Sequence, residues 1–301
     1  TRERVRRAAE ELGYEPTRNG RRSRQQVVGF WAFGAAAEDE GYASLTFRLS
    51  ETLNAAQKRL EVRSFPEIPE PGEFNELLRE EGLPDQVLVC GRIPHEHLEL
   101  LADANPNCCL LGHVPHLTGE AERPPAPCVS WREEEISSVA VRLLLERGYR
   151  KIGCFCKKLY PGMSQARFVS GYRLALLEAG VVPGSGWVAE GGARYERGEE
   201  ALEEMLKDEG VPEAFVAPSA RAMAFFRRAL RERGFEVPNG STVFWDANGK
   251  CTDYGLTGCT RLQTDQLKMV TMALHLSSNP RPFADGTLIS LPFDIVDAGA
   301  S

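Results

Sequence analysis

Short apolar segments alternate with longer amphipathic segments through most of the chain. VVGFWAF, QVLVCG, CCLLG, KIGCFC, AFVAP and TVFWD have the length and composition of buried strands, and helix-like segments separate them. Several of these segments end at Gly148, Gly180, Gly210 or Gly234, and glycine is the common residue just after a helix. Regular alternation of strand and helix predicts an α/β fold with parallel sheets that have helices on both faces.

The Pro-rich stretch ERPPAPC at 122–128 interrupts this series near its middle. Proline and glycine clusters mark loops and domain boundaries, so we expect two doubly wound parallel-sheet subdomains. In such sheets ligands bind at the carboxyl ends of the strands. Two facing sheets would therefore place their binding loops across one ligand cleft.

The first 24 residues differ from the rest because they carry eight arginines and four glutamates in a chain of net charge −7. Val5, Ala8, Ala9 and Leu12 recur at helical spacing and predict a short amphipathic helix over 2–12. Its apolar face is too small for stability in isolation, which implies a partner or a docking surface. Residues 17–26 are polar, basic and aperiodic, as in a linker or a segment that orders on binding.

Composition and motifs narrow the class of protein further. No stretch reaches the roughly 18 consecutive apolar residues of a membrane span, and the N-terminus does not resemble a signal peptide, so we expect a cytoplasmic protein. The eight cysteines are then expected to be reduced thiols.

A nucleophile elbow and a phosphate-binding glycine loop are both missing from the sequence, and GVVPGSG lacks the spacing of a nucleotide site. We expect no enzyme activity and no cofactor.

Cysteine and histidine are the usual zinc ligands, so a zinc site has to be considered. The candidate ligands are Cys108, Cys109, His113 and His116 in CCLLGHVPH, and the pair His95 and His97. Neither group has the paired cysteine spacing of a structural zinc site, and CCLLG has the pattern of a strand. We therefore expect no metal.

Several segments resemble the lactose-repressor (LacI) family of bacterial transcriptional regulators. TRERVRRAAEELGYEP is similar to the last helix of that family's DNA-binding headpiece, and the next ten residues occupy the place of its hinge. LLLERGYRKIG, SGYRLALLEAG, RRALRERGFEVPNGSTVFWD and LTGCTRLQTDQLKMV resemble the effector domain, in the family's order and spacing. The resemblance covers nearly the whole chain.

The resemblance implies a periplasmic-binding-protein-like fold of type I and a homodimer. Residues 1–26 would be the remnant of the headpiece and hinge, 27–128 with about 262–290 the N-terminal subdomain, and 129–261 with about 291–301 the C-terminal subdomain. Dimer contacts are expected in 45–60 and near 77–101. A small effector in the cleft, usually a sugar or a nucleobase-like molecule, would control affinity for operator DNA. The two headpiece helices that precede the helix over 2–12 in the family are absent from the sequence, which implies a truncated chain.

The hinge-like segment holds the arginines that we expect to contact DNA, which are Arg18, Arg21, Arg22 and Arg24. Phosphate contacts require positive charge rather than a particular fold, although a solvated basic linker is the alternative. The family's hinge inserts a leucine into the minor groove, and that position here is Ser23. Because serine cannot serve as an apolar wedge, we expect less DNA kinking and more affinity from salt-sensitive arginine contacts.

The effector site is predicted from the family's pocket positions. Trp245 and Asp246 end the strand FWD, where the family places an aromatic ring and a carboxylate that accepts hydrogen bonds from ligand hydroxyls. Alternatively, Asp246 is a loop or cap residue and Trp245 a core residue. The family's effector-binding arginine falls at Phe168, with Arg167 one position earlier.

Other pocket positions depart from the family. Ser219 and Ala220 replace an asparagine and aspartate pair, and the acidic residue after PCVS falls at Trp131 or Arg132. Trp31, Tyr42 and Ser44 stand in place of the polar loop after the first strand. The predicted effector-binding set is Asp246, Trp245, Arg167, Phe168, Trp131, Ser219 and Ser44.

Fewer polar groups and more aromatic groups indicate either a flatter ligand than a hexose, such as a carbohydrate or glycoside with an extended apolar face, or a degenerate site. The main hypothesis is a ligand-responsive regulator. The alternative is a transport-type sugar-binding protein of the same fold, which would carry an export signal and favour paired cysteines.

Overall fold

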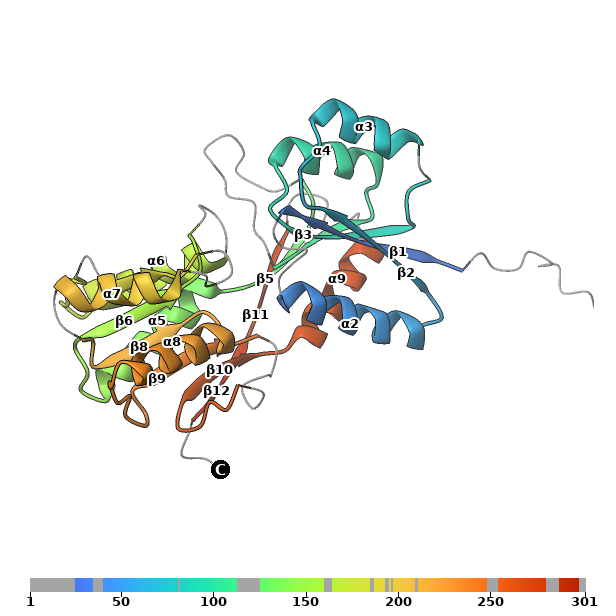
Figure 1. Ribbon diagram of the computed structural model, residues 1–301. Coiled ribbons are helices and arrows are strands. Elements are labelled where there is room, and N and C mark those ends of the chain that lie inside the picture. The colour runs from blue at the N-terminus through green and yellow to red at the C-terminus, as the bar shows by residue number, and fades with distance from the viewer. Residues whose placement is uncertain are drawn as a thin grey trace, which may run out of the picture.

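The computed structural model shows two subdomains, each built on its own sheet (Figure 1). The structure describes residues 25–34, 40–80, 82–112, 125–159, 164–184, 187–192, 195, 197–208, 211–247, 254–279 and 287–297. The predicted helix over 2–12 and the four hinge arginines lie outside this set. The predicted α/β fold with two mainly parallel sheets is confirmed.

The first sheet has six strands in the order β11-β5-β4-β3-β1-β2. Their bounds are β11 (Leu288–Leu291), β5 (Cys128–Trp131), β4 (Cys108–Leu111), β3 (Gln86–Gly91), β1 (Val27–Phe33) and β2 (Arg59–Phe65). All of these neighbours pair in parallel. Every residue of β1 and of β3 is buried, which explains why both strands are almost continuous apolar runs.

The second sheet repeats this plan in the order β12-β10-β9-β8-β6-β7. Its strands are β12 (Phe293–Val296), β10 (Thr260–Thr264), β9 (Thr242–Asp246), β8 (Ala214–Ala217), β6 (Ile152–Cys156) and β7 (Val188–Glu190). Only the pairing of β12 with β10 is antiparallel among those that the structure describes.

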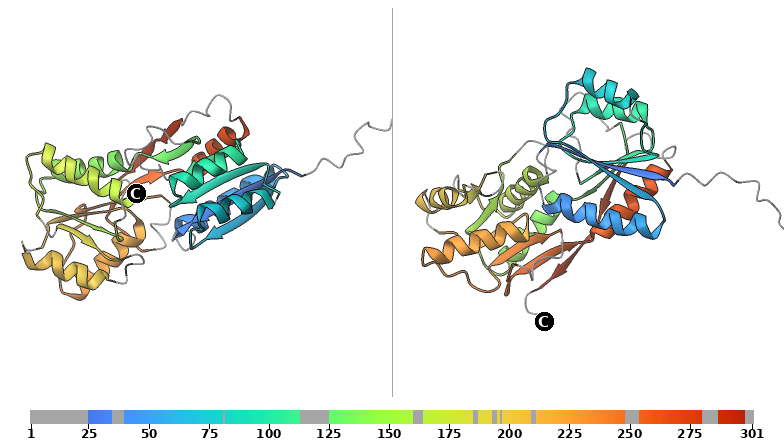
Figure 2. Two further views of the ribbon diagram at one scale, coloured as in Figure 1. Left: turned by 90° about the horizontal axis from the view of Figure 1, so that it is seen from above. Right: turned by 45° about the vertical axis from the view of Figure 1, so that its right-hand side comes forward.

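Helices cover both faces of each sheet, as Figures 1 and 2 show. On the first sheet, α3 (Pro71–Glu80) lies beside α4 (His95–Ala104), and α2 (Glu40–Ala55) beside α9 (Gln266–Ser278). On the second sheet, α5 (Glu133–Glu146) pairs with α6 (Ser164–Glu178), and α7 (Gly198–Asp208) with α8 (Ala220–Glu232). Each pair buries its apolar face against a sheet. The α3–α4 face and the α7–α8 face have cores of their own, whereas the α2–α9 face and the α5–α6 face share one core that extends across both subdomains. Within the described residues, no helix has both the length and the apolar character needed to cross a membrane.

Glycine ends three of the helical segments, as the sequence predicts. Gly148, Gly180 and Gly234 follow α5, α6 and α8 with φ values of +93°, +73° and +79°. These angles lie in the left-handed region that only glycine adopts readily, so each residue can turn the chain back toward the next strand. Gly210 lies outside the described residues.

The chain crosses between the subdomains near three places. Strand β5 belongs to the first sheet, whereas α5 starts two residues later and packs on the second. Strand β10 belongs to the second sheet, and α9 returns to the first. Strand β11 pairs in the first sheet and β12 in the second. The crossings therefore fall at about Arg132, Asp265 and Pro292, within a few residues of the predicted divisions at 128, 262 and 290.

Candidate functional site

The carboxyl ends of the two sheets meet at the crossings. Trp131 ends β5 and Thr264 ends β10, and each is followed within two residues by a helix of the other subdomain. The ends of β6, β8 and β9 point the same way as β10, because these strands pair in parallel with one another. Ligand sites of doubly wound sheets lie at this end. The predicted site residues on these strands, and at the start of the helices that follow them, thus lie at the carboxyl edge of the sheets.

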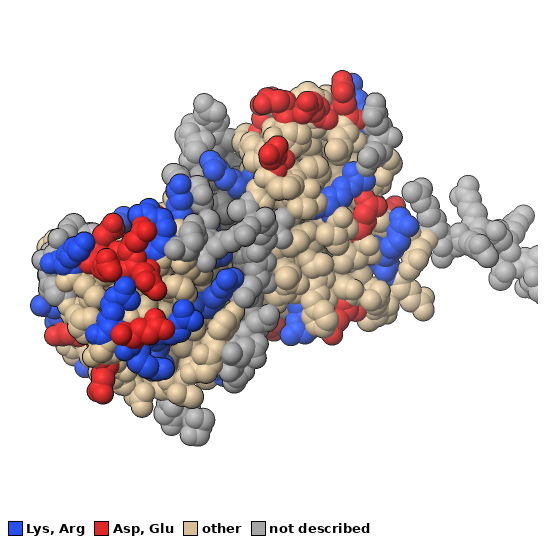
Figure 3. Space-filling view, viewed as in Figure 1, with Lys and Arg blue, Asp and Glu red and all other residues tan. Residues whose placement is uncertain are grey.

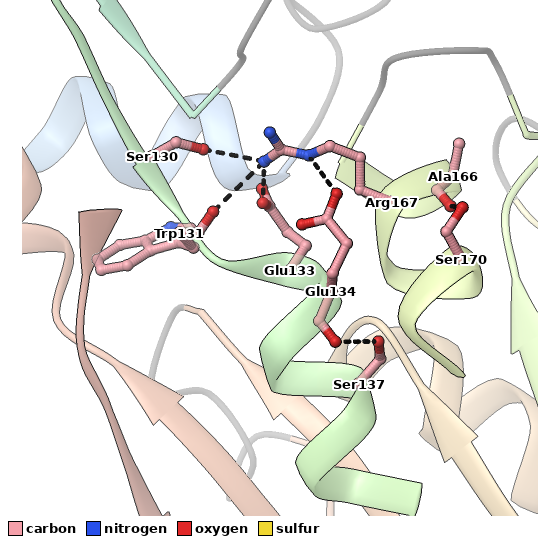
Figure 4. Close-up of polar contacts among 8 residues, drawn as sticks. All are labelled: Ser130, Trp131, Glu133, Glu134, Ser137, Ala166, Arg167 and Ser170. Atoms are coloured by element: carbon pink, nitrogen blue, oxygen red, sulfur yellow. Dashed lines mark hydrogen bonds and ion pairs between the residues drawn. The ribbon is translucent and has the colours of Figure 1, made fainter. Parts of the chain in front are cut away.

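Arg167 lies at the centre of a polar cluster at the start of α5 and α6 (Figure 4). Its Nη2 atom donates a hydrogen bond to Ser130 Oγ at 3.0 Å and to the carbonyl oxygen of Trp131 at 3.4 Å. It also donates to Glu133 Oε2, and Arg167 Nε lies 3.8 Å from Glu134 Oε1. The cluster joins β5 of the first sheet to two helices of the second subdomain.

Burial gives this cluster its electrostatic character. Arg167 is 9% exposed and Glu133 is fully buried. Burial lowers the pKa of the Arg167 guanidinium from its ordinary value, yet arginine stays protonated in proteins. A buried charge of this kind requires an opposite charge, which Glu133 supplies. Glu133 Oε1 and Arg167 Nε are nevertheless buried without a hydrogen-bond partner among the described residues.

Helix α6 packs closely on α5 beside the cluster. A Cβ atom at Gly171 would lie 2.1 Å from the Glu134 carbonyl oxygen and 2.3 Å from Ser137 Oγ, so only glycine fits. Ser138 Oγ adds a hydrogen bond of 3.1 Å to the Gly171 carbonyl oxygen. This close crossing holds the first turn of α6, and with it Arg167, against the first turn of α5.

Asp246 and Trp245 end β9 at the same edge of the second sheet. Asp246 is 1% exposed. Trp245 is 7% exposed, belongs to the hydrophobic core, and donates a hydrogen bond from Nε1 to Thr264 Oγ1 at 3.1 Å. The indole is therefore anchored between β9 and β10. Contact of either residue with a ligand stays a prediction.

Ser219 caps helix α8. Its side-chain oxygen accepts a hydrogen bond from Ala222 N at 3.1 Å and lies 3.2 Å from the Tyr195 hydroxyl. Serine is a favoured N-cap because it satisfies an amide at the helix start. The hydroxyl at this position thus has a structural role, and its contact with a ligand stays a prediction.

The remaining predicted residues are packed or hydrogen bonded. Phe168 is fully buried and Trp131 is 5% exposed, and both lie in the hydrophobic core. Ser44 on α2 donates a hydrogen bond of 2.6 Å to Gln266 Oε1 at the start of α9. Tyr42 stacks on Phe30 with ring centroids 5.0 Å apart. The rings therefore contribute packing in this structure, and any role in ligand binding stays a prediction.

Sequence reasoning missed two residues at this end of the second sheet. Tyr195 is 2% exposed, has a positive φ of 66° and stacks on Phe155, while Lys157 Nζ lies 5.7 Å from its ring centroid. Its segment, GGARYERG, has no pattern that indicates such a role. Glu133 has no sequence signal of its own either, because three glutamates open α5 and only the structure shows that the first of them is buried.

A separate open groove lies at the opposite, amino end of the second sheet. It has a volume of about 540 Å³ and is lined by residues that include Tyr149, Pro212, Phe235 and Pro238. These residues precede β6, β8 and β9. Since ligands of doubly wound sheets bind at the carboxyl ends, this groove is not the predicted effector site.

The cysteines in the described residues are buried and free. They are Cys90, Cys108, Cys109, Cys128, Cys154, Cys156 and Cys259. Burial raises the pKa of the Cys108 and Cys128 thiols to about 12, so both stay protonated near neutral pH. In the described part of the chain no three His, Cys, Asp or Glu side chains gather as metal ligands, and His113 and His116 lie outside it.

These features define a protein of the periplasmic-binding type, with two sheets that meet at their carboxyl ends. Residues 76–253 match the family described as periplasmic binding proteins and sugar binding domain of LacI family. The chain belongs to this family, which confirms the resemblance.

The relatives agree with this membership. Catabolite control protein A of Priestia megaterium is 24% identical over 212 residues, which cover 69% of this chain and 62% of the relative. The transcriptional repressor PurR of Haemophilus influenzae is 26% identical over 139 residues, which cover 46% of this chain and 41% of PurR. The chain thus spans about three fifths or less of these relatives.

Solved structures share the fold over almost the whole chain. The transcriptional regulator CelR in complex with cellobiose has a TM-score of 0.74 at 20% identity, covering 98% of this chain and 89% of CelR. The Lac repressor dimer bound to operator and the anti-inducer ONPF has a TM-score of 0.73 at 16% identity, covering 98% and 88%. At these identities the likeness shows the fold alone.

Proposed function

We propose that this chain is the effector-binding part of a ligand-responsive, DNA-binding transcriptional regulator that acts as a homodimer in the cytoplasm. Family membership carries the proposal, because the matched region is described as the sugar-binding domain of LacI family. The relatives catabolite control protein A and PurR, by their names, are regulators. The protein would act by binding rather than by catalysis.

The effector that we propose is a carbohydrate or glycoside, held where the carboxyl ends of the sheets meet. Support comes from the buried polar groups at that end, which include the Asp246 carboxylate and the Arg167 cluster. A carboxylate can accept hydrogen bonds from adjacent sugar hydroxyls. CelR was solved with cellobiose, which is consistent with this class of ligand for a protein of the same fold.

Charge distribution favours the N-terminal segment as the part that contacts DNA. In the view of Figure 3, acidic side chains gather over α3 and α4, and both signs intermingle on the second subdomain. This face offers no uniform positive surface to a phosphate backbone. The arginines at 18, 21, 22 and 24 remain the proposed DNA contacts.

Two observations bear on the transport-type alternative. The seven cysteines in the described residues are free, whereas an exported protein would favour paired cysteines. The arginine-rich N-terminal segment also has no use in a transport protein. Both points favour the regulator.

Operator binding by a chimera tests the regulator directly. The two headpiece helices that precede the helix over 2–12 in the LacI family, joined upstream of Thr1, should give sequence-specific binding in fluorescence anisotropy, with affinity that falls steeply as salt rises. Replacing Arg21 and Arg22 by alanine should reduce the salt slope by about one unit for each phosphate that is no longer neutralised. A chimera that is monomeric in light scattering and binds no operator would contradict the proposal.

A thermal-shift screen of sugars, glycosides and nucleosides tests the effector. A ligand present at one hundred times its dissociation constant stabilises the folded state by about 2.7 kcal/mol. Asp246→Ala should then weaken binding of the hit roughly tenfold to a hundredfold, because a charged acceptor is worth about 1.5 to 3 kcal/mol. Normal binding by this variant would remove Asp246 from the site. If no compound shifts the melting temperature, a regulator with a degenerate effector site becomes the better account.

A further inference from the structure

Glu133 differs from the two glutamates beside it. Glu134 and Glu135 are exposed, and Glu135 pairs with Arg132 at 3.0 Å on the surface. Glu133 has no exposed surface, and only its Oε2 atom bonds to Arg167. A helix start favours any acidic residue through its dipole. Since the exposed neighbours already supply that effect, the helix dipole alone does not explain a buried carboxylate.

Two buried atoms of this pair retain hydrogen-bonding capacity. Glu133 Oε1 is an acceptor and Arg167 Nε is a donor, and neither has a hydrogen-bond partner in the described part of the protein. Leaving a buried polar atom without a partner costs free energy, which a ligand group that bonds to it would recover. A hydroxyl group can donate to one atom and accept from the other, whereas a carboxylate or phosphate oxygen can only accept.

The charges of the cluster also favour an uncharged ligand with hydroxyl groups over an anion. Arg167 is opposed by Glu133 and by Glu134 at 3.8 Å, so the cluster has no positive charge left for an anion. An acidic ligand would bring a third negative charge next to a fully buried carboxylate. Such like-charge contacts cost free energy in a low-dielectric interior.

We propose that Glu133 determines the specificity of the effector site. Its Oε1 atom accepts a hydrogen bond from a ligand hydroxyl, and its charge offsets Arg167, so the site takes uncharged polyhydroxy ligands and rejects their acidic counterparts. This inference rests on the proposed function, because it assumes that a small effector binds where the sheets meet. It assigns Arg167 to positioning of Glu133 rather than to recognition of an anion.

Matched pairs of compounds test the proposal on the 301-residue chain. The probes are glucose with glucuronate, galactose with galacturonate, cellobiose, and ribose with ribose 5-phosphate, measured by thermal shift and then by calorimetric titration. The wild-type protein should bind a neutral probe at least tenfold more tightly than the matched acidic one. Glu133→Gln should reduce that ratio at least tenfold, since it removes the repulsion and leaves the charge of Arg167 less opposed. Glu135→Gln, on the same turn but paired with Arg132, should leave the ratio unchanged.

Three results would overturn the proposal. One is equal or tighter binding of an acidic probe by the wild-type protein, which decides the question even if Glu133→Gln does not fold. A second is a folded Glu133→Gln protein with the wild-type ratio, which would make the residue purely structural. The third is no binding of any probe, because Glu133 would then accept no hydrogen bond from a ligand hydroxyl. Operator binding by the chimera is measured without these probes, so failure here is distinguishable from failure of the regulator assignment.

Discussion

Helix α5 has an arginine cluster at each end, and the two clusters differ in how completely they are satisfied. At the carboxyl end, Arg147 donates to the Gly240 carbonyl oxygen at 2.8 Å, to Thr260 Oγ1 at 2.9 Å and to Asp297 Oδ1 at 2.9 Å. At the amino end, Arg167 and Glu133 are buried and each retains an atom without a hydrogen-bond partner among the described residues.

The difference indicates what each cluster does. Arg147 joins three segments of one subdomain with ordinary hydrogen bonds and stays partly exposed. Its geometry is complete without any further group. The Arg167 cluster lies at the junction of the subdomains and keeps one donor and one acceptor unused. Proteins satisfy most buried polar atoms internally, so this unused capacity calls for an explanation, and a ligand hydroxyl is the one that we propose.

Removing each arginine should give the largest contrast. Arg167→Ala leaves Glu133 buried without its opposite charge, which should lower the free energy of unfolding by about 3 to 5 kcal/mol. Arg147→Ala removes a pair with the exposed Asp297, where solvent screens the charges, and should cost about 1 kcal/mol. Urea denaturation of both variants measures the contrast. Equal losses of stability would mean that the two clusters do the same structural work.

An alanine at Gly171 should have the next largest effect. The added Cβ meets the backbone of α5, so the helices must separate, at a cost of about 1 to 3 kcal/mol. Gly180→Ala is the matched control on the same helix segment. It adds no contact within 4 Å but forces alanine to a φ of +73°, which costs about 1 kcal/mol.

Ligand affinity separates these two glycine variants further. Gly171→Ala displaces Arg167 from Glu133 and should weaken binding of the neutral probe at least tenfold, whereas Gly180→Ala should leave binding unchanged. Calorimetric titration of both proteins checks this. Equal affinities would show that the close crossing of α5 and α6 does not position the site.

The smallest expected effect concerns a helix cap. Ser219→Ala removes the side-chain acceptor for Ala222 N and should lower stability by about 1 kcal/mol. Asp265→Ala is the matched control, because Asp265 caps α9 at the same end of the molecule by accepting from Leu267 N at 2.9 Å. Thermal unfolding should give similar decreases for the two variants. A much smaller decrease for Ser219→Ala would leave ligand binding as the better explanation of that residue.

The sequence predicts the fold well because the fold depends on local patterns. Apolar runs of strand length and glycines after helices mark the elements without knowledge of distant contacts. The places where the chain crosses between the subdomains are predicted less exactly. CVSW is an apolar strand that either sheet could accommodate, and its sequence does not indicate which sheet it joins.

Site residues are harder to predict because their environment is non-local. The sequence pattern places Phe168 at a ligand position. In the structure the Phe168 ring is fully buried on a helix that packs closely on α5 at Gly171, and the sequence around Phe168 does not show this packing. Arg167 was identified from its position, whereas its partner Glu133 lies 34 residues earlier and is brought to it only by the fold. Tyr195 has no local signal at all.

A crystal structure with the neutral probe that binds most tightly shows directly whether Glu133 contacts the ligand. We expect a ligand hydroxyl oxygen at about 2.5 to 3.0 Å from Glu133 Oε1, the length of a hydrogen bond between oxygen atoms. A bound ligand whose hydroxyls all lie beyond hydrogen-bonding distance of Glu133, with the Arg167 cluster unchanged, would contradict it.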